Sequence, residues 1–388
     1  MPTISSVGQS FALDGREACI QAIEEAKQKI LHEADHIVMA FIFASREYNL
    51  QSVLSGASAQ LRTTPLFGFS TEGQIQGNGE HQRSIVVALL AGDDFTVQAN
   101  WWGDIFHYPQ TKLQEMLESF VPSVGKTENF LLIHMDGMHG EHETLCKILS
   151  AGHYRTFGTL TGHNDRQKSA FQIGGLTGGD HGLSIAALQG NLKASVGVAH
   201  GWQRVGKYFE LTRTEDLWVR QLNDRPAAET YASLFGQQMR DWAFPPLNRL
   251  VRLYPLGLED GEHLTVKSPL FVEVDGSLRM TTHVPQGKIG HVLVGSVQKS
   301  LEAARQAAQQ ALTGLGSARP ILALVFADIA WKMLFETQPG QELSPIREVL
   351  GPNVPIAGGY TLGQIYTNST NVEVLNQHIE IILLGAVD

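Results

Sequence analysis

Two stretches near opposite ends of the chain carry the same pattern of residues that could bind a small molecule. Residues 63–75 and 353–365 each contain a proline, two apolar residues, a glycine, a threonine and a closing Gly-Gln-Ile. Glycine lets another group approach the backbone closely, and a few convergent hydroxyl and N–H groups are what a polar pocket needs. The opposing interpretation is that these glycines serve tight turns alone. The ligand-binding residues that we predict are Gly68, Phe69, Ser70, Thr71, Gly73, Gly358, Tyr360, Thr361 and Gly363.

A weaker third copy of this pattern, at residues 154–163, indicates an internal repeat. Such self-similarity is typical of a repeated supersecondary unit. The unit that we expect is a strand, a helix, a short strand, the glycine-threonine loop and a further strand. The predicted first strands are 37–44, 130–135 and 321–327, and the predicted last strands are 85–92, 183–190 and 379–385.

The repeat favours an α/β fold whose sheets pack on each other with the helices outside. Loops at the carboxyl ends of strands are where open α/β sheets usually bind ligands, so the two stretches should face one cleft. A chain of 388 residues exceeds the usual size of a single hydrophobic core. We therefore predict two domains on a pseudo-duplicated core, at residues 1–240 and 247–388, with the cleft between them.

The composition of the chain limits the classes of molecule that it could bind. The formal net charge of −10 argues against nucleic acid and anionic membrane surfaces, which both select Lys and Arg. The two cysteines, with no Cys-x-x-Cys, exclude a disulfide framework and a covalently attached c-type haem. No apolar run reaches the roughly 18 residues of a membrane span, and residues 1–15 lack the features of a signal peptide. A cytoplasmic protein is the expectation.

Six motifs occur in order along the chain. They are residues 68–73, Asp136-Gly137, residues 158–162, His200-Gly201-Trp202, Arg225-Pro226-Ala227 and residues 355–363. With these motifs the chain resembles the FIST proteins (F-box and intracellular signal transduction), with the N-terminal and C-terminal halves both present.

Three places depart from the family pattern. Asp328 to Lys332 stands where a Cys-x-x-x-Arg turn is common, Gln364 replaces an acidic residue, and His163 falls where an aspartate is usual.

The resemblance implies a sensory protein that binds a small ligand and catalyses no reaction. Stand-alone bacterial members of this length resemble haem-based nitric oxide sensors that regulate a partner histidine kinase or a cyclic-di-GMP enzyme. That interpretation implies haem b as cofactor, and a homo-oligomer is compatible with it. The alternative within the same class is a haem-free sensor of a small organic ligand such as an amino acid.

A haem b would need an axial ligand, usually His or Cys, in an apolar pocket. His200 ends an apolar strand close to Trp202, so it offers both a nitrogen and an aromatic wall. His139 and His163 follow other strand ends and are alternatives to it. The opposing interpretation of each is a histidine that bonds to backbone or lies exposed on a loop.

A third hypothesis is a hydrolase or isomerase that uses Asp136, His139 or Glu72. Asp136 and Asp328 follow equivalent strands, as a pair of acid–base carboxylates would. An aspartate that caps the following helix explains both positions equally well. His139 and His142 share a helical face, but the sequence lacks a zinc motif, a nucleophile elbow and a phosphate loop. We therefore expect a protein that is not an enzyme.

Overall fold

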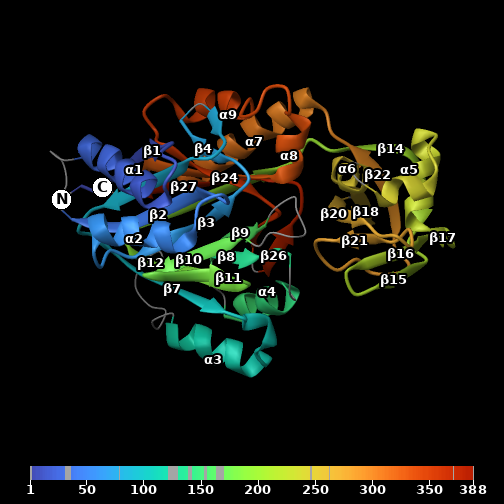
Figure 1. Cartoon of the computed structure of the whole chain (residues 1–388), viewed down its shortest axis with the longest axis horizontal. Helices are drawn as coiled ribbons and strands as arrows, with labels where there is room; N and C mark the ends of the chain where they lie inside the picture. Colours follow the sequence, from blue (N-terminus) through green and yellow to red (C-terminus); the bar gives the residue numbers. More distant parts are fainter. Residues whose placement is uncertain are drawn as a thin grey trace.

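The chain folds into a larger body and a smaller body, which Figure 1 shows side by side. Both chain termini lie on the larger body, at the end away from the smaller one (Figure 1). The larger body consists of three repeated units, and an insertion at residues 203–294 forms the smaller body. The computed structural model describes residues 2–30, 36–77, 79–120, 130–138, 142–152, 155–162, 170–244, 247–261, 263–369 and 371–387.

The three units share one order of elements: a strand, a helix, two parallel strands joined by a helical segment, a hairpin and a last strand. The first unit has β1 (Ile4–Ser10), α1 (Gly15–Ile30), β2 (Ile37–Ser45), α2 (Leu50–Leu61), β3 (Leu66–Thr71), β4 (Gln74–Gln76), β5 (Gly79–His81) and β6 (Ile85–Ala91). The second has β7 (Phe95–Gly103), η1 (Ile105–His107), α3 (Gln110–Phe120), β8 (Phe130–Asp136), α4 (His142–Ala151), β9 (Thr156–Thr161), β10 (Phe171–Gly175), β11 (Thr177–Asp180) and β12 (Gly182–Gly190). The third has β13 (Leu192–Ala199), α7 (Val297–Leu315), β23 (Arg319–Asp328), α8 (Ile329–Leu334), α9 (Leu343–Leu350), β24 (Ile356–Thr361), β25 (Gly363–Asn368), β26 (Asn371–Leu375) and β27 (Ile379–Ala386).

Each unit completes its sheet with a hairpin from another unit. The β4–β5 hairpin pairs with β24, the β10–β11 hairpin with β3, and the β25–β26 hairpin with β9. The resulting sheets have the orders β1-β6-β2-β3-β10-β11, β26-β25-β9-β8-β12-β7 and β13-β27-β23-β24-β4-β5. These exchanges close a ring, so the sheet of each unit depends on a strand pair from a neighbour.

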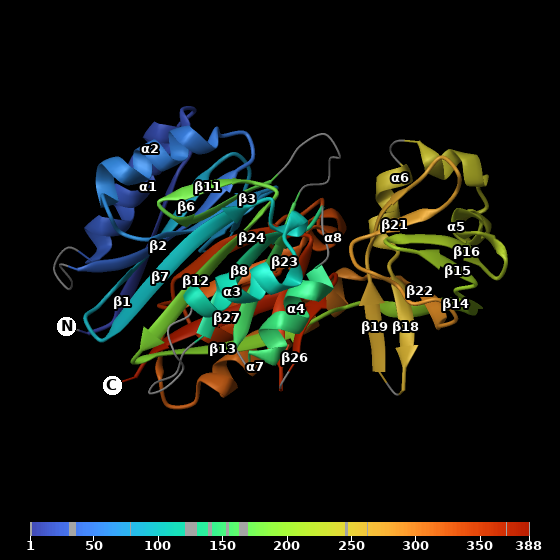
Figure 2. The same ribbon diagram turned by 90° about the horizontal axis from the view of Figure 1, so that it is seen from below.

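The sheets of the larger body are covered on both faces. One face looks into an interior shared by the three sheets, where Phe43, His134 and Phe326 occupy equivalent positions. The rings of Phe43 and His134 lie 5.7 Å and 5.8 Å from that of Phe326. Helices cover the other faces, as α1 and α7 show (Figure 2). The predicted α/β fold with packed sheets and outer helices is confirmed. None of the described helices combines the length and apolar character that a membrane crossing requires.

The smaller body enters the chain between β13 and α7. Its sheets have the orders β14-β22-β18-β19 and β15-β16-β21-β20, with β17 beside β16. Its elements are β14 (Gln203–Glu210), β15 (Arg213–Glu215), β16 (Trp218–Leu222), β17 (Arg225–Pro226), α5 (Ala227–Phe235), η2 (Met239–Ala243), α6 (Leu247–Leu250), η3 (Val251–Leu253), β18 (Leu256–Asp260), β19 (His263–Lys267), β20 (Pro269–Val272), β21 (Leu278–Met280) and β22 (Ile289–Val294). The predicted boundary between residues 240 and 247 falls inside this body.

Candidate functional site

The carboxyl ends of the parallel strands meet at one edge of the larger body. In each unit, the last residue of one strand lies opposite a threonine that ends the next. The pairs are Ser45 with Thr71, Asp136 with Thr161, and Asp328 with Thr361. All six residues are buried, so this edge is built from three equivalent polar pairs.

A glutamine near the start of each exchanged hairpin clamps this edge. Its amide N–H donates to the strand-end threonine, and its amide oxygen accepts a backbone N–H beside the last strand. The first contacts are Gln74 Nε2 to Thr71 O (3.1 Å), Gln172 Nε2 to Thr161 Oγ1 (2.6 Å) and Gln364 Nε2 to Thr361 Oγ1 (3.2 Å). The second are Ser84 N to Gln74 Oε1 (3.0 Å), Gly182 N to Gln172 Oε1 (3.2 Å) and His378 N to Gln364 Oε1 (3.2 Å). The repeated Gly-Gln-Ile therefore has a structural role.

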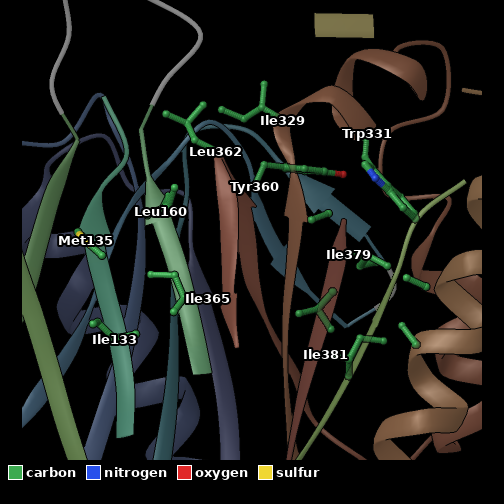
Figure 3. Packing of buried hydrophobic residues seen from close by; sticks show 14 of the residues in the cluster. Ile133, Met135, Leu160, Ile329, Trp331, Tyr360, Leu362, Ile365, Ile379 and Ile381 are labelled. Atoms are coloured by element: carbon green, nitrogen blue, oxygen red, sulfur yellow. The ribbon is translucent and has the colours of Figure 1, made fainter. Parts of the chain in front are cut away.

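The first and third predicted loops do come together at this edge. The backbone N–H of Tyr360 donates to the hydroxyl of Thr71, which donates in turn to the carbonyl of Tyr360. Ser70 Oγ accepts the N–H of Phe171 at 3.0 Å. Figure 3 shows Tyr360 near the strand ends, with its ring among buried apolar side chains. These hydroxyl contacts are all within the protein, and a ligand role for the hydroxyls stays a prediction.

The predicted glycines lie in closely packed backbone. Gly68 and Gly358 are inside β3 and β24, where a Cβ atom would collide with the carbonyl oxygens of Ile42 and Val325 on the neighbouring strands. Phe69 points into the shared interior, with its ring 4.5 Å from that of His134. Close strand packing thus accounts for Gly68 and Gly358. The remaining predicted glycines, also buried, are Gly73 and Gly363.

A buried charged network ties the first unit to the third. Lys332 Nζ donates to the Glu72 carbonyl at 2.7 Å and to Glu80 Oε1 at 2.8 Å. The Tyr360 hydroxyl donates to Glu342 Oε1 at 2.5 Å. Burial raises the pKa of Glu342 to about 7, against the hydrogen bond from Tyr360, which favours the carboxylate. Lys332 stands where the FIST-like pattern has arginine, and its contacts with Glu72 and Glu80 support the first loop.

The edge meets the smaller body at the turn between β26 and β27. Gln377 in this turn has a φ of 60°, a left-handed conformation that a non-glycine residue rarely adopts. Its carbonyl oxygen accepts both indole N–H groups of Trp202 (2.9 Å) and Trp331 (3.0 Å). Its side-chain amide donates to the Arg252 carbonyl at 2.7 Å and to Ser268 Oγ at 2.9 Å, both in the smaller body. This turn therefore anchors one body on the other.

We call Arg252, Ser268, Asp328, Asn376 and Gln377 the junction cluster. Asn376 Oδ1 accepts the N–H of Ser268 at 3.2 Å, and Asp328 Oδ2 accepts that of Gln377 at 3.1 Å. Three buried side-chain atoms of the cluster have no hydrogen-bond partner among the described residues. They are Arg252 Nη2, Asn376 Nδ2 and Gln377 Oε1. Buried polar atoms are nearly always paired with protein groups or with ordered water, so these three atoms offer hydrogen bonds that the described side chains do not use.

The charges of the junction cluster are strongly desolvated. Burial lowers the pKa of Arg252 to about 10, although the carboxylates of Asp328 and Glu72 act in the opposite direction. Burial also raises the pKa of Asp328 to about 6, against the stabilising N–H donors of Ala330 and Gln377 and the charge of Arg252. Because little water competes for hydrogen bonds at such a site, a hydrogen bond or charge added there would contribute more free energy than it would in water.

Two pockets open beside the junction cluster, between α4 and the smaller body. One has a volume of about 500 Å³ and the other of about 460 Å³. They share Glu143, Lys147 and Thr282. Thr282 Oγ1 donates to Asn376 Oδ1 at 3.1 Å, so one residue that lines both pockets contacts the cluster.

One of the three histidines predicted as haem ligands is described. His139 and His163 lie outside the described residues. His200 Nδ1 accepts the N–H of Trp202 at 3.2 Å, and its ring packs edge-on against His378 with 4.8 Å between centroids. Nδ1 and one face of the ring are thus engaged within the protein, and ligation of a haem by His200 stays a prediction.

The predicted acid–base residues have separate partners. Asp136 accepts the N–H of Met138 at 2.8 Å, ahead of α4, which begins at His142, and its second oxygen lies 2.9 Å from His181 Nδ1. The predicted helix cap is found at Asp328, which precedes α8 and accepts the N–H of Ala330 at 2.9 Å. Glu72 forms an ion pair with Arg46 at 3.0 Å. Asp136 and Glu72 thus belong to different local networks.

The comparison with family models assigns the chain. The FIST N domain matches residues 38–225, and the FIST C domain matches residues 227–367. The chain belongs to the FIST family. The FIST N match covers the second unit and the first unit from β2 onward, and the FIST C match covers most of the third unit, so the ring of exchanged hairpins needs both. FIST domains are associated with signal transduction and with the sensing of small ligands.

The solved structures that match this chain share little sequence with it. A cyanuric acid hydrolase from A. caulinodans is 8% identical over 100% of both chains, with a TM-score of 0.39. A PurLQS structure from Thermotoga maritima is 10% identical over 100% of this chain and 73% of that one, with a TM-score of 0.26. Likeness at this level says nothing about activity. A comparison with curated proteins finds no match.

The sequence pattern missed the junction cluster. Arg252 and Ser268 belong to no repeat, and they lie more than a hundred residues from Asn376 along the chain. Gln377 had a signal, because it is equivalent to Arg83 and His181, which have φ values of 52° and 53°. Aligning the residues just before the three last strands would have revealed this special position.

Proposed function

We propose that this FIST protein is a sensor of a small ligand that carries a carboxylate and an amino group, as a free amino acid does. The ligand binds at the junction cluster. The observation that supports this most is the set of three buried, unpartnered polar atoms of Arg252, Asn376 and Gln377 among the described residues.

The chemistry of these atoms selects such a ligand. A guanidinium group binds a carboxylate through parallel N–H donors, and Arg252 Nη2 is buried without another acceptor in the described part of the chain. The amide N–H of Asn376 would add a second donor to the carboxylate. The amide oxygen of Gln377 and the carboxylate of Asp328 would accept hydrogen bonds from the ammonium group. A ligand with one charge of each sign leaves the net charge of the cluster unchanged.

Binding there would act on the arrangement of the two bodies. Arg252 belongs to the smaller body, whereas Asp328, Asn376 and Gln377 belong to the larger one. A ligand that contacts both stabilises the arrangement in which it makes all its contacts. A partner signalling protein, such as a histidine kinase or a cyclic-di-GMP enzyme, would respond to that change.

A thermal-shift panel tests this proposal. We expect one or a few of the standard amino acids to raise the Tm, and their amides and N-acetyl derivatives to lose the effect. At a hundred times the Kd the ligand should stabilise the fold by about 2.7 kcal/mol. Arg252→Gln should abolish the shift, while Arg240→Gln, on an exposed arginine of the same body, should retain it. Absence of any shift at millimolar concentration would refute the proposal, as would an unchanged shift in folded Arg252→Gln.

The finer hypothesis, a haem-based nitric oxide sensor, rests on the family resemblance and on the supply of histidines. His200 is the candidate axial ligand that the structure describes, and its Nδ1 accepts the N–H of Trp202. The visible spectrum of protein expressed with added haem tests the hypothesis. A Soret band that moves with nitric oxide and vanishes in His200→Ala would establish it, whereas a colourless protein would exclude haem under those conditions.

A catalytic role for Asp136 is a further candidate, because its carboxylate holds an imidazole nitrogen of His181 at 2.9 Å. A buried carboxylate that orients a histidine is a common acid–base arrangement. His181→Gln and Asp136→Asn should then abolish turnover of any substrate found. Equal turnover in both variants and the wild type would remove the acid–base role of this pair.

A further inference from the structure

A second chemical feature lies in the pocket of about 460 Å³ between α4 and the smaller body. Figure 1 shows α4 on the side of the larger body that faces the smaller one. Its charged wall residues are Glu143 and Lys147 from α4, Glu373 from β26, and Lys267 from β19. Glu143 and Lys147 are exposed, whereas Lys267 is partly shielded. The volume lies within the range of small-molecule sites. The pocket is thus lined by two lysines, of which Lys147 is exposed and Lys267 is partly buried.

Lys267 differs from an ordinary surface lysine in its surroundings. Its ammonium nitrogen donates to the neutral hydroxyl of Thr282 at 3.1 Å, and Thr282 bonds in turn to Asn376. Desolvation lowers the pKa of Lys267, and the more distant charge of Glu143 only partly opposes this effect. A lysine in such surroundings holds a larger fraction of free amine near neutral pH, and the free amine is the nucleophile.

We propose that Lys267 is a nucleophilic amine that captures a small aldehyde or ketone in this pocket as an imine. This proposal concerns a carbonyl compound at Lys267, whereas the proposed function concerns an amino acid at the junction cluster. The imine proposal therefore does not depend on the proposed function. Lys147 lines the same space but is exposed, so it serves as an internal comparison.

The step balances without any further reactant. The Nζ lone pair of Lys267 forms a C–N bond to the carbonyl carbon, and the carbonyl oxygen takes up a proton to give a carbinolamine. The nitrogen gives up its two protons in the course of the reaction, the oxygen takes up a second proton and leaves as water, and the C=N bond remains. Glu143, which lines the same pocket, can accept and return these protons. Amine and carbonyl compound thus give imine and water, and no electrons are gained or lost.

Reductive trapping with benzaldehyde tests the proposal on the full chain. A limiting amount of benzaldehyde is added at pH 7 with sodium cyanoborohydride, which reduces an imine to a stable benzylamine. Peptide mapping by mass spectrometry then compares the labelling of all lysines in one sample. We expect Lys267 to be labelled roughly tenfold faster than Lys147, because a larger fraction of its side chain is present as the free amine that reacts. This comparison within the wild type does not depend on any variant folding.

Two variants sharpen the result. Lys267→Arg keeps the positive charge but cannot form an imine, so the dominant adduct should disappear. Lys147→Arg should leave the adduct at Lys267 unchanged. Labelling spread evenly over the exposed lysines, or no labelling of Lys267, would overturn the proposal. A dominant adduct that persists in Lys267→Arg would overturn it as well.

Discussion

Thr71 and Tyr360 lie 289 positions apart and share two hydrogen bonds. The Tyr360 N–H donates to Thr71 Oγ1 at 2.9 Å, and the same hydroxyl donates to the Tyr360 carbonyl at 2.8 Å. One buried side chain thereby joins the strand ends of the first and third units. This contact holds the first and third repeated loops together at the edge that meets the smaller body.

Thr71→Val should lower the free energy of unfolding by about 1–3 kcal/mol. Valine has nearly the shape of threonine, but it removes the buried hydroxyl that accepts the Tyr360 N–H and donates to the Tyr360 carbonyl. Urea denaturation followed by circular dichroism measures the change. Thr96→Val, at an exposed position of β7, is the matched control and should change the free energy little. Equal effects of the two substitutions would show that the contact is not stabilising.

The three glutamine clamps should contribute comparably to stability. Gln74→Ala, Gln172→Ala and Gln364→Ala each remove an amide that bonds to a strand-end threonine and to a backbone N–H. We expect each to cost about 1–3 kcal/mol in unfolding free energy. Gln98→Ala, on an exposed position of β7, is the control. If only one of the three clamps mattered, the structural equivalence of the units would not extend to their energetics.

Glu342→Gln should flatten the pH dependence of stability. Burial raises the pKa of Glu342 to about 7 in the folded state, from the value near 4.3 expected when unfolded. Between these two values the folded state binds the extra proton, so its stability falls as pH rises through this window. The glutamine side chain would keep an oxygen for the Tyr360 hydroxyl and carry no charge. The variant should therefore gain roughly 1–3 kcal/mol relative to the wild type between pH 4.5 and pH 8.

The control for this experiment is Glu348→Gln, whose carboxylate is exposed on α9 and pairs with Arg305. Its stability difference from the wild type should change little over the same pH range. Unfolding free energies from urea titrations at several pH values give both differences. A Glu342→Gln curve parallel to that of the wild type would mean that Glu342 titrates normally in the folded protein.

The repeated unit was predictable from the sequence because its signals are local. Apolar runs of strand length and the Gly-x-x-Thr pattern recur in each copy, and each copy forms the predicted strands. The Gln172-Ile173 of the second unit was not recognised as part of the repeat, because residues 163–169 lie between Thr161 and Gln172 and change the spacing. The pairing of Ile173 with Gly68 is nevertheless preserved. Pairing across an insertion is a tertiary property that spacing does not reveal.

The sequence was a poorer guide to the ligand site than to the repeated unit. Gly68 and Gly358 were predicted for ligand approach, and in the structure a neighbouring strand takes up the space that a side chain would need. Both roles require the absence of a Cβ atom, so residue type cannot separate them. Arg252 became prominent only through its burial and the charge of Asp328 acting on it, because an isolated arginine outside any repeat gives no signal of its own.

Amide hydrogen exchange tests the central claim, that a small ligand binds between the two bodies, most directly. The full chain is compared with and without the amino acid that gives the largest Tm increase. Binding at the junction cluster predicts slower exchange in residues 249–254, 266–270 and 376–379, with little change elsewhere. Protection confined to other segments, with these three unchanged, would contradict a ligand site at the junction.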